Sequence, residues 1–239
     1  LLLVRHINMN ILDIHLQIDS RNEGALYMET VAKFNNIVAT TEELEAIVGL
    51  PGNLVKNKVM NYLDHHCINF INLSPFCMVS TSDENGNCDV SPRGDKPGFA
   101  CILDQKTLVL PERPGNRRID SMRNIISNPH IGLLFLIPGL GETLRINGKA
   151  CLITDDKILE QMSDGSKKPS IGIAVEVEEC FIHCAKAFKR SGLWEPETWE
   201  GEENLPSAAK ILSEHAKKAN LSETEIEQIL VRDYKERLY

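Results

Sequence analysis

Two adjacent arginines, Arg117 and Arg118, follow a Pro-Gly loop and precede the apolar pattern of a short helix. The pattern predicts that Asn116 caps this helix and that both arginines lie in its first turn. A helix N-terminus already carries unpaired N–H groups and a partial positive charge, so added cations there suit a bound anion. Guanidinium groups match phosphate well. We therefore predict a phosphate site; the alternative is a solvated basic turn that Asp120 partly neutralises.

Two other groups of residues could complete such a site. Ser91 and Arg93 flank Pro92 at the end of a predicted strand. A proline inside a strand pattern indicates an edge or a break, so we expect Arg93 at the rim of a sheet. Arg190 and Trp194 belong to a second basic and aromatic group. This group either ends a surface helix or closes over a flat ligand, and the residues alone favour neither.

Other chemistries find less support. The segment Gly139-Leu140-Gly141 lies between two predicted strands and opens no helix, so it reads as a hairpin turn and not as a dinucleotide-binding loop. The sequence has no nucleophile elbow and no phosphate-binding P-loop. The segments 65–67 and 180–184 contain His and Cys, but no closely spaced Cys pair occurs twice, and we predict no metal site. His183 is the one candidate for a general acid or base.

Composition bounds the class of protein. The chain has 239 residues and a net charge of −8, which argues against a nucleic-acid surface. Seven cysteines, an odd number, indicate free thiols in a reducing compartment, and we expect a cytoplasmic protein. The opening run 1–4 is interrupted by Arg5 and His6, so it predicts neither a secretory leader nor a membrane span.

Two regions are expected along the chain. Residues 1–39 are predicted to be an N-terminal leader, and residues 40–239 a single domain with helical N- and C-terminal extensions. The chain does not begin with Met, and Glu23-Gly24 is compatible with a ribosome-binding sequence in the gene before Met28. Our hypothesis is that the natural start is Met28; the mass of the protein from its native host would test it.

The periodicity of apolar residues predicts mostly short strands at hairpin spacing. A helix is expected after Thr40, another over 54–71 and a third near 117–126. Further helices are expected at 155–162, 184–190, 208–219 and 223–234. Strands are predicted at 76–81, 88–93, 99–103, 107–110, 131–137, 143–153 and 171–182. A parallel sheet would need a helix after nearly every strand, so this order favours a mainly β fold, an antiparallel barrel with peripheral helices.

Taken in order, several short motifs resemble the pyridoxamine 5′-phosphate oxidase-related family of FMN-binding split barrels, and within it a bacterial subgroup. The resemblance covers roughly residues 40–196. The motifs that carry it are Ser74-Pro75-Phe76, Cys88 to Asp95, Arg113 to Asp120, Asn128-Pro129, Leu133-Leu134-Phe135, Ile137-Pro138-Gly139, Thr143 to Gly148, and His183 to Trp194.

The resemblance implies an antiparallel FMN-binding split β-barrel with flanking helices, working as a homodimer with FMN in a groove shared between subunits. Asn116, Arg117 and Arg118 stand where the family holds the FMN phosphate. Arg93 matches the region of a basic residue that ends the flavin-lining strand. Ser91 and Thr143 would offer hydrogen bonds to the isoalloxazine ring.

The implied function is FMN-dependent oxidation or reduction of a small molecule, with NAD(P)H as a possible reductant. The C-terminal Arg-His segment by which the true oxidases grip pyridoxal phosphate is missing, so vitamin B6 oxidation is not expected. The group from Lys186 to Trp194 would instead contact another substrate or the partner subunit. The alternatives are a non-catalytic flavin- or haem-binding storage protein, a deazaflavin in place of FMN, and a structural dimer with an empty groove.

Overall fold

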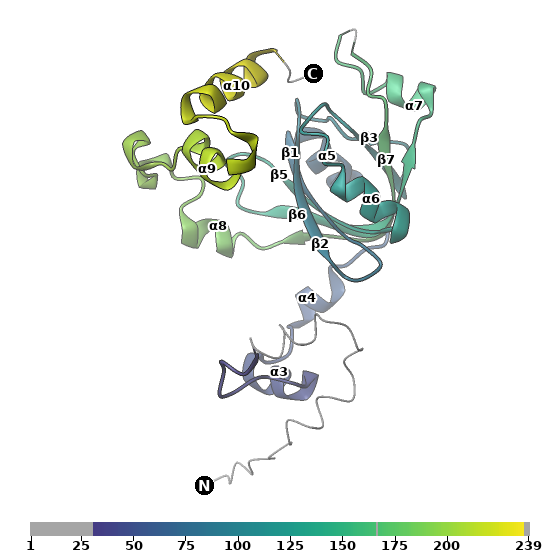
Figure 1. Ribbon diagram of the computed structural model, residues 1–239. Helices are drawn as coiled ribbons and strands as arrows, with labels where there is room; N and C mark the ends of the chain where they lie inside the picture. Colours follow the sequence, from purple (N-terminus) through teal and green to yellow (C-terminus); the bar gives the residue numbers. More distant parts are fainter. Residues whose placement is uncertain (1–30, 166, 237–239) are drawn as a thin grey trace. The chain divides into compact units, whose positions relative to one another are not determined.

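Seven strands form one antiparallel sheet in the order β2-β1-β5-β6-β7-β4-β3. The structure is a computed structural model, shown in Figure 1, and it describes residues 31–165 and 167–236. The strands are β1 (Phe76–Ser82), β2 (Cys88–Gly94), β3 (Cys101–Ile102), β4 (Thr107–Pro111), β5 (His130–Leu136), β6 (Thr143–Ile153) and β7 (Gly172–His183). The prediction of an antiparallel β fold with flanking helices is confirmed.

Hairpin pairing explains most of this order. The pairs β1–β2, β3–β4, β5–β6 and β6–β7 join strands that follow each other in the sequence. The first of these turns depends on Asp83, whose carboxylate accepts hydrogen bonds from the backbone N–H groups of Asn85 and Asn87. Two non-sequential pairs, β1–β5 and β4–β7, complete the sheet. Strands β2 and β3 are therefore its edges.

The core lies on one face of the sheet because apolar side chains alternate along the strands. In β1, for example, Val79 is fully buried and Thr81 is buried, while Ser80 between them is exposed. Phe135 and Leu133 of β5 and Ile146 of β6 belong to the same cluster. One irregularity interrupts the regular register, a β-bulge between Asn147 and Gly148 where β6 faces β7.

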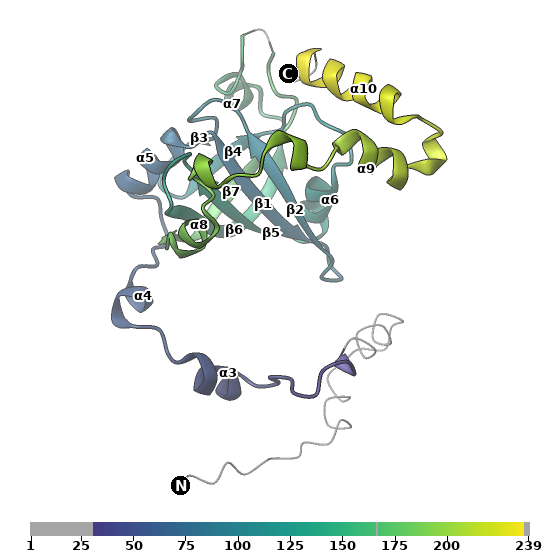
Figure 2. The same ribbon diagram turned by 90° about the vertical axis from the view of Figure 1, so that its left-hand side faces the viewer.

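Two helices cover parts of this sheet. Helix α5 (His65–Leu73) buries Cys67, Phe70 and Ile71, and Asp64 caps its N-terminus by accepting a 2.8 Å hydrogen bond from the Cys67 N–H. Helix α6 (Asp120–Ser127) contacts β1, β2 and β6, as Figure 1 shows. In the described part of the chain, four α-helices follow α6: α7 (Asp156–Glu160), α8 (Lys186–Ser191), α9 (Ala208–His215) and α10 (Glu223–Glu236). The last two pack against each other (Figure 2).

The structure contradicts two helix predictions. The helix expected over 54–71 is divided into α4 (Asn53–Asn57) and α5. Between them Met60 pairs with Cys180 of β7, and the Leu63 N–H donates to the Gln105 carbonyl, so tertiary hydrogen bonds replace the helical ones. Helix α6 begins at Asp120 and has Ile119 as its N-cap, so Asn116 is not the cap and both arginines precede the helix.

Contacts divide the chain into two units, Leu1–Asn53 and Leu54–Tyr239. In the first unit, Thr40 caps α3 (Thr41–Val48) through the Glu43 N–H, and Gly49 ends the helix with a φ of 83°. The hypothesis of a start at Met28 and most of the predicted leader fall outside the described residues. The boundary between residues 39 and 40 stays a prediction. Among the described helices, none has the length and apolar character needed to cross a bilayer.

Candidate functional site

A cavity of about 700 Å³ opens between β2, the end of β4, the segment 112–119, the start of α6 and the segment 168–171. It brings together five of the eight residues singled out from the sequence, namely Ser91, Arg93, Asn116, Arg117 and Arg118. They come from an edge strand and from the approach to a helix that lies beside it (Figure 1). The volume is in the usual range for a site that takes a small molecule.

Where β2 lines this cavity, its residues alternate between half-buried and exposed. Asp89, Ser91 and Arg93 are half-buried, while their neighbours along the strand are exposed. The Asp89 carboxylate accepts a hydrogen bond of 2.5 Å from Ser121, a buried hydroxyl in the first turn of α6. This bond joins the strand to the helix at the cavity wall, so both elements hold a fixed position around it.

Arg93 and Glu112 form an ion pair inside the cavity, with 3.4 Å between Nη2 and Oε2. The pair does not reach hydrogen-bond geometry. As a result, within the described residues the buried Arg93 Nε and Glu112 Oε2 lack a hydrogen-bond partner. Burial raises the pKa of the Glu112 carboxyl, and the nearby Arg93 charge opposes that rise. Since a buried donor without a partner is costly, Arg93 is a donor suited to a ligand.

Arg113 has a structural contact in the same wall. Its Nε donates to Asp95 at 2.7 Å and its Nη2 to the Met162 carbonyl at 2.8 Å, and the Asp95 side chain is only 4% exposed. Two hydrogen bonds from different nitrogens of one guanidinium group, to two separate acceptors, fix its plane. Arg113 and Phe99 also line a second cavity of about 240 Å³, so they separate the two spaces.

The segment around Arg117 has an unusual backbone. Arg117 and Ile119 adopt positive φ values of 60° and 56°, a region that residues other than glycine rarely enter. Such conformations cost energy and tend to occur at ligand-binding positions. The Asn116 side chain accepts from the Arg118 N–H at 3.0 Å, and Arg118 pairs with Asp120 at 2.7 Å. Arg117 and Arg118 of this loop both line the cavity.

The charge of the cavity differs from that of the whole chain. Five cationic side chains line it against three carboxylates, whereas the chain carries a net charge of −8. The cations are Arg93, Arg113, Arg117, Arg118 and Lys168; the carboxylates are Asp89, Glu112 and Asp120. An excess of positive charge in a partly enclosed space favours an anionic ligand.

The other three predicted residues lie outside the cavity lining. Thr143 is 2% exposed at the start of β6, where it faces His183 of β7. Arg190 is exposed on α8. The Trp194 indole N–H donates to the Leu140 carbonyl at 2.9 Å and its ring stacks on Phe188, so it joins the end of α8 to the β5–β6 turn. A ligand contact for these three stays a prediction.

Among the cavity residues that sequence reasoning missed are Asp89, Glu112, Ser121 and Lys168. The alternation of β2 could have indicated Asp89, because it shares a face with Ser91 and Arg93. Lys168 comes from a segment far along the chain, and it pairs with Asp156 at 2.5 Å. No spacing in the sequence connects this segment with β2.

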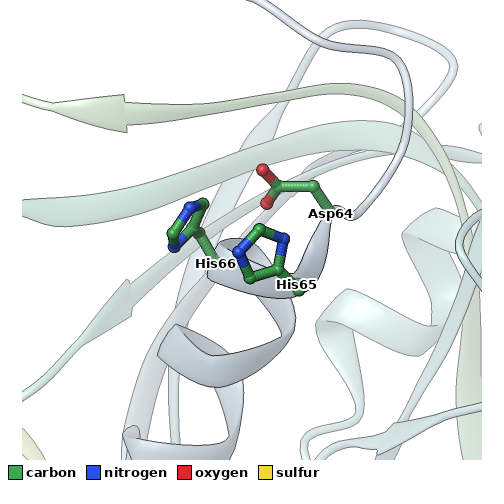
Figure 3. Close-up of side chains that lie close together, drawn as sticks. All are labelled: Asp64, His65 and His66. Atoms are coloured by element: carbon green, nitrogen blue, oxygen red, sulfur yellow. The ribbon is translucent and has the colours of Figure 1, made fainter.

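One group of described residues has the donor types of a metal site. The carboxylate of Asp64 and the imidazoles of His65 and His66 have donor atoms within 4.8 Å of one another at the start of α5 (Figure 3). Asp64 already caps the helix, and the positive end of the helix dipole opposes a cation. These residues lie outside the cavity lining, and we assign no metal to them.

Comparison with protein families gives a match between residues 63–184 and the family described as pyridoxamine 5′-phosphate oxidase. The matched segment contains the whole sheet and every residue of the cavity. It spans just over half of the chain. The chain belongs to the pyridoxamine 5′-phosphate oxidase family. The resemblance inferred from the short motifs is thereby confirmed. Comparison with curated proteins finds no match.

Several solved structures are similar to this oxidase-family chain. HupZ from Group A Streptococcus has 20% identity and a TM-score of 0.42, covering 50% of this chain and 92% of its own. An FMN-binding protein from Syntrophomonas wolfei has 12% identity and a TM-score of 0.39, covering 66% and 97%. The haem storage protein HutZ from Vibrio cholerae has 13% identity and a TM-score of 0.37, covering 51% and 93%. At such values none of them indicates what this chain binds.

Proposed function

We propose that this protein binds FMN and uses it as an oxidoreductase that acts on a small organic molecule. The observation that carries the proposal is the basic cavity beside β2, which gathers Arg93, Arg117 and Arg118 around one space. In the proposed complex Arg117 and Arg118 hold the phosphate, and Asn116 orders the loop that carries them. Family membership supports the same ligand.

The residues of the cavity fit FMN in two respects. Arg93 Nε is a buried donor without a partner among the described residues, and a phosphate or a flavin carbonyl would satisfy it. The cavity volume of about 700 Å³ leaves room for a ligand larger than phosphate alone. The hydroxyl of Ser91, on the same face of β2, would then donate to the ring system.

Bound FMN would supply the hydride or electron chemistry, while the chain binds and orients it. We propose a homodimer with FMN at the subunit interface, NAD(P)H as a candidate reductant, and Thr143, Arg190 and Trp194 as further contacts in the assembled site. We also propose a cytoplasmic protein, a location that suits the seven free thiols.

The absorption spectrum of the purified full chain tests this function. We expect visible flavin bands that NADPH or NADH bleaches without oxygen, and a released chromophore with the mass of FMN. Two other results would replace the proposal. Flavin bands that neither nicotinamide bleaches would indicate storage, and a Soret band would indicate haem. A colourless protein whose melting temperature FMN leaves unchanged would contradict flavin binding altogether.

Glu112 should weaken phosphate binding because its carboxylate competes for Arg93. We expect Glu112→Gln to tighten FMN binding roughly tenfold at neutral pH, since it removes one negative charge beside the phosphate. Burial raises the pKa of Glu112, so the native carboxyl becomes neutral as the pH falls through that raised value. The advantage of the variant should therefore shrink toward acid pH.

Titration of FMN fluorescence at several pH values measures this effect. The matched control is Glu178→Gln, because Glu178 pairs with Lys149 outside the cavity lining and should leave the affinity unchanged. Equal affinity in native protein and Glu112→Gln across the whole pH range would show that Glu112 does not face the bound phosphate.

A further inference from the structure

Two buried thiols that lie outside the cavity lining touch each other. Cys67 lies in α5 and Cys180 in β7, 113 positions apart in the sequence, and their sulfur atoms are 3.3 Å apart. Cys180 is 0% exposed and Cys67 is 7% exposed. A disulfide needs a separation of about 2 Å, so a movement of roughly 1 Å would allow the bond to form.

The backbone on both sides holds the two thiols in place. Asp64 caps the first turn of α5 through the Cys67 N–H, as described above. Cys180 and Met60 exchange two backbone hydrogen bonds, of 3.0 and 2.6 Å. These contacts connect the segment before α5 to β7, so the sulfur atoms meet because of the fold and not through the chance placement of two mobile side chains.

The two thiols differ in reactivity. Cys180 donates its S–H to the sulfur of Cys67, and this hydrogen bond lowers the pKa of the Cys67 thiol. Burial and the carboxylate of Asp64 act against that decrease. The same hydrogen bond, together with burial, raises the pKa of Cys180. Because the thiolate is the reactive form and only Cys67 has any exposed surface, Cys67 is the thiol that an oxidant would reach first.

We propose that Cys67 and Cys180 form a site of reversible oxidation by hydroperoxides, which ends in a disulfide between α5 and β7. In the first step the Cys67 sulfur attacks hydrogen peroxide, the O–O bond breaks, and Cys67 becomes a sulfenic acid while water leaves. In the second step the Cys180 sulfur attacks that sulfenic sulfur, the S–S bond forms, and a second water leaves. One peroxide is reduced and two thiols are oxidised.

The test uses the full chain in which the three exposed cysteines are replaced, Cys88→Ser, Cys151→Ser and Cys184→Ser. Four thiols remain in this parent, at positions 67, 77, 101 and 180. It is treated with hydrogen peroxide, alkylated after unfolding, and mapped without reduction. Trypsin and chymotrypsin are used together, because residues 67 and 77 share one tryptic peptide. We expect one peptide that links Cys67 to Cys180, and its loss on reduction.

Two single variants separate the roles. With Cys180→Ser, Cys67 should stop at the sulfenic acid and be trapped by dimedone. With Cys67→Ser, Cys180 should stay an alkylatable thiol. Cys77 is the internal control, since burial raises the pKa of its thiol to about 12 and it should stay reduced in every sample. A folded parent in which both Cys67 and Cys180 remain alkylatable after peroxide, or one that links Cys67 to another cysteine, would overturn the proposal.

Discussion

Replacing Arg117 and Arg118 together by alanine should abolish retention of FMN while leaving the fold intact. Each guanidinium group lost from a phosphate removes charge-assisted hydrogen bonds, and we expect roughly a hundredfold loss of affinity or more for the pair. The fold should survive because both side chains are exposed and precede α6 instead of packing under it. Flavin absorbance per mole of purified protein measures the loss.

Arg123→Ala is the matched control for this experiment. Arg123 is an exposed arginine on α6, and it does not line the cavity. It should leave flavin occupancy unchanged, which separates loss of the phosphate contact from a general loss of positive charge. Unchanged occupancy in the double variant would show that the phosphate lies elsewhere. Loss of occupancy with a lowered melting temperature would instead point to a damaged fold. Circular dichroism distinguishes a damaged fold from loss of the phosphate contact alone.

The strands were the most predictable part of the fold, because alternation is a local property of the sequence. Strand β6 was predicted at 143–153 and is observed at Thr143–Ile153. Along it, Leu144, Ile146 and Ala150 are buried, whereas Arg145 and Lys149 between them are exposed. A pattern with period two can only place these residues on one face of a strand, so sequence alone was sufficient.

The helix starts were less predictable, because they depend on distant partners. Nothing local to residues 58–64 shows that Met60 will pair with Cys180, and this contact is what divides the expected helix. The start of α6 was also predicted wrongly. Asn116 has the right side chain for a cap, but its oxygen accepts from Arg118 in a loop that continues to Ile119. The Asn116 side chain is therefore used inside the loop and not at the helix N-terminus.

The sequence predicted the chemical type of the candidate site, an anion site, but not all of the residues that form it. Arg117 and Arg118 indicate an anion site through their own neighbours in the sequence, and the structure places both at a basic cavity. Glu112 has no such local signal. Its competition with Arg93 exists only because the end of β4 comes near the edge strand β2, and that proximity is a property of the sheet order.

Gly148→Ala should destabilise the protein more than any other single glycine-to-alanine change in the sheet. Gly148 lies at the β-bulge between β6 and β7, where an added Cβ would overlap the Glu176 carbonyl oxygen. That atom belongs to the backbone of a central strand, so no side-chain rotation relieves the overlap. We expect a loss of about 3 kcal/mol or more in the free energy of unfolding, at the upper end for overpacking. For a chain of this size that corresponds to a fall of roughly 6–12 °C in Tm.

Gly132→Ala supplies the comparison, because Gly132 lies in the neighbouring strand β5 and has room for a methyl group. Its nearest atoms would be Asn147 Oδ1 at 3.6 Å and Ser80 Cβ at 3.8 Å, which are ordinary van der Waals contacts. Both variants add the same methyl group to a strand, so the difference between their Tm values isolates the close approach at the bulge. Equal Tm values would mean that β6 and β7 can separate at Gly148 with little cost, and that the bulge does not fix the register of the two strands.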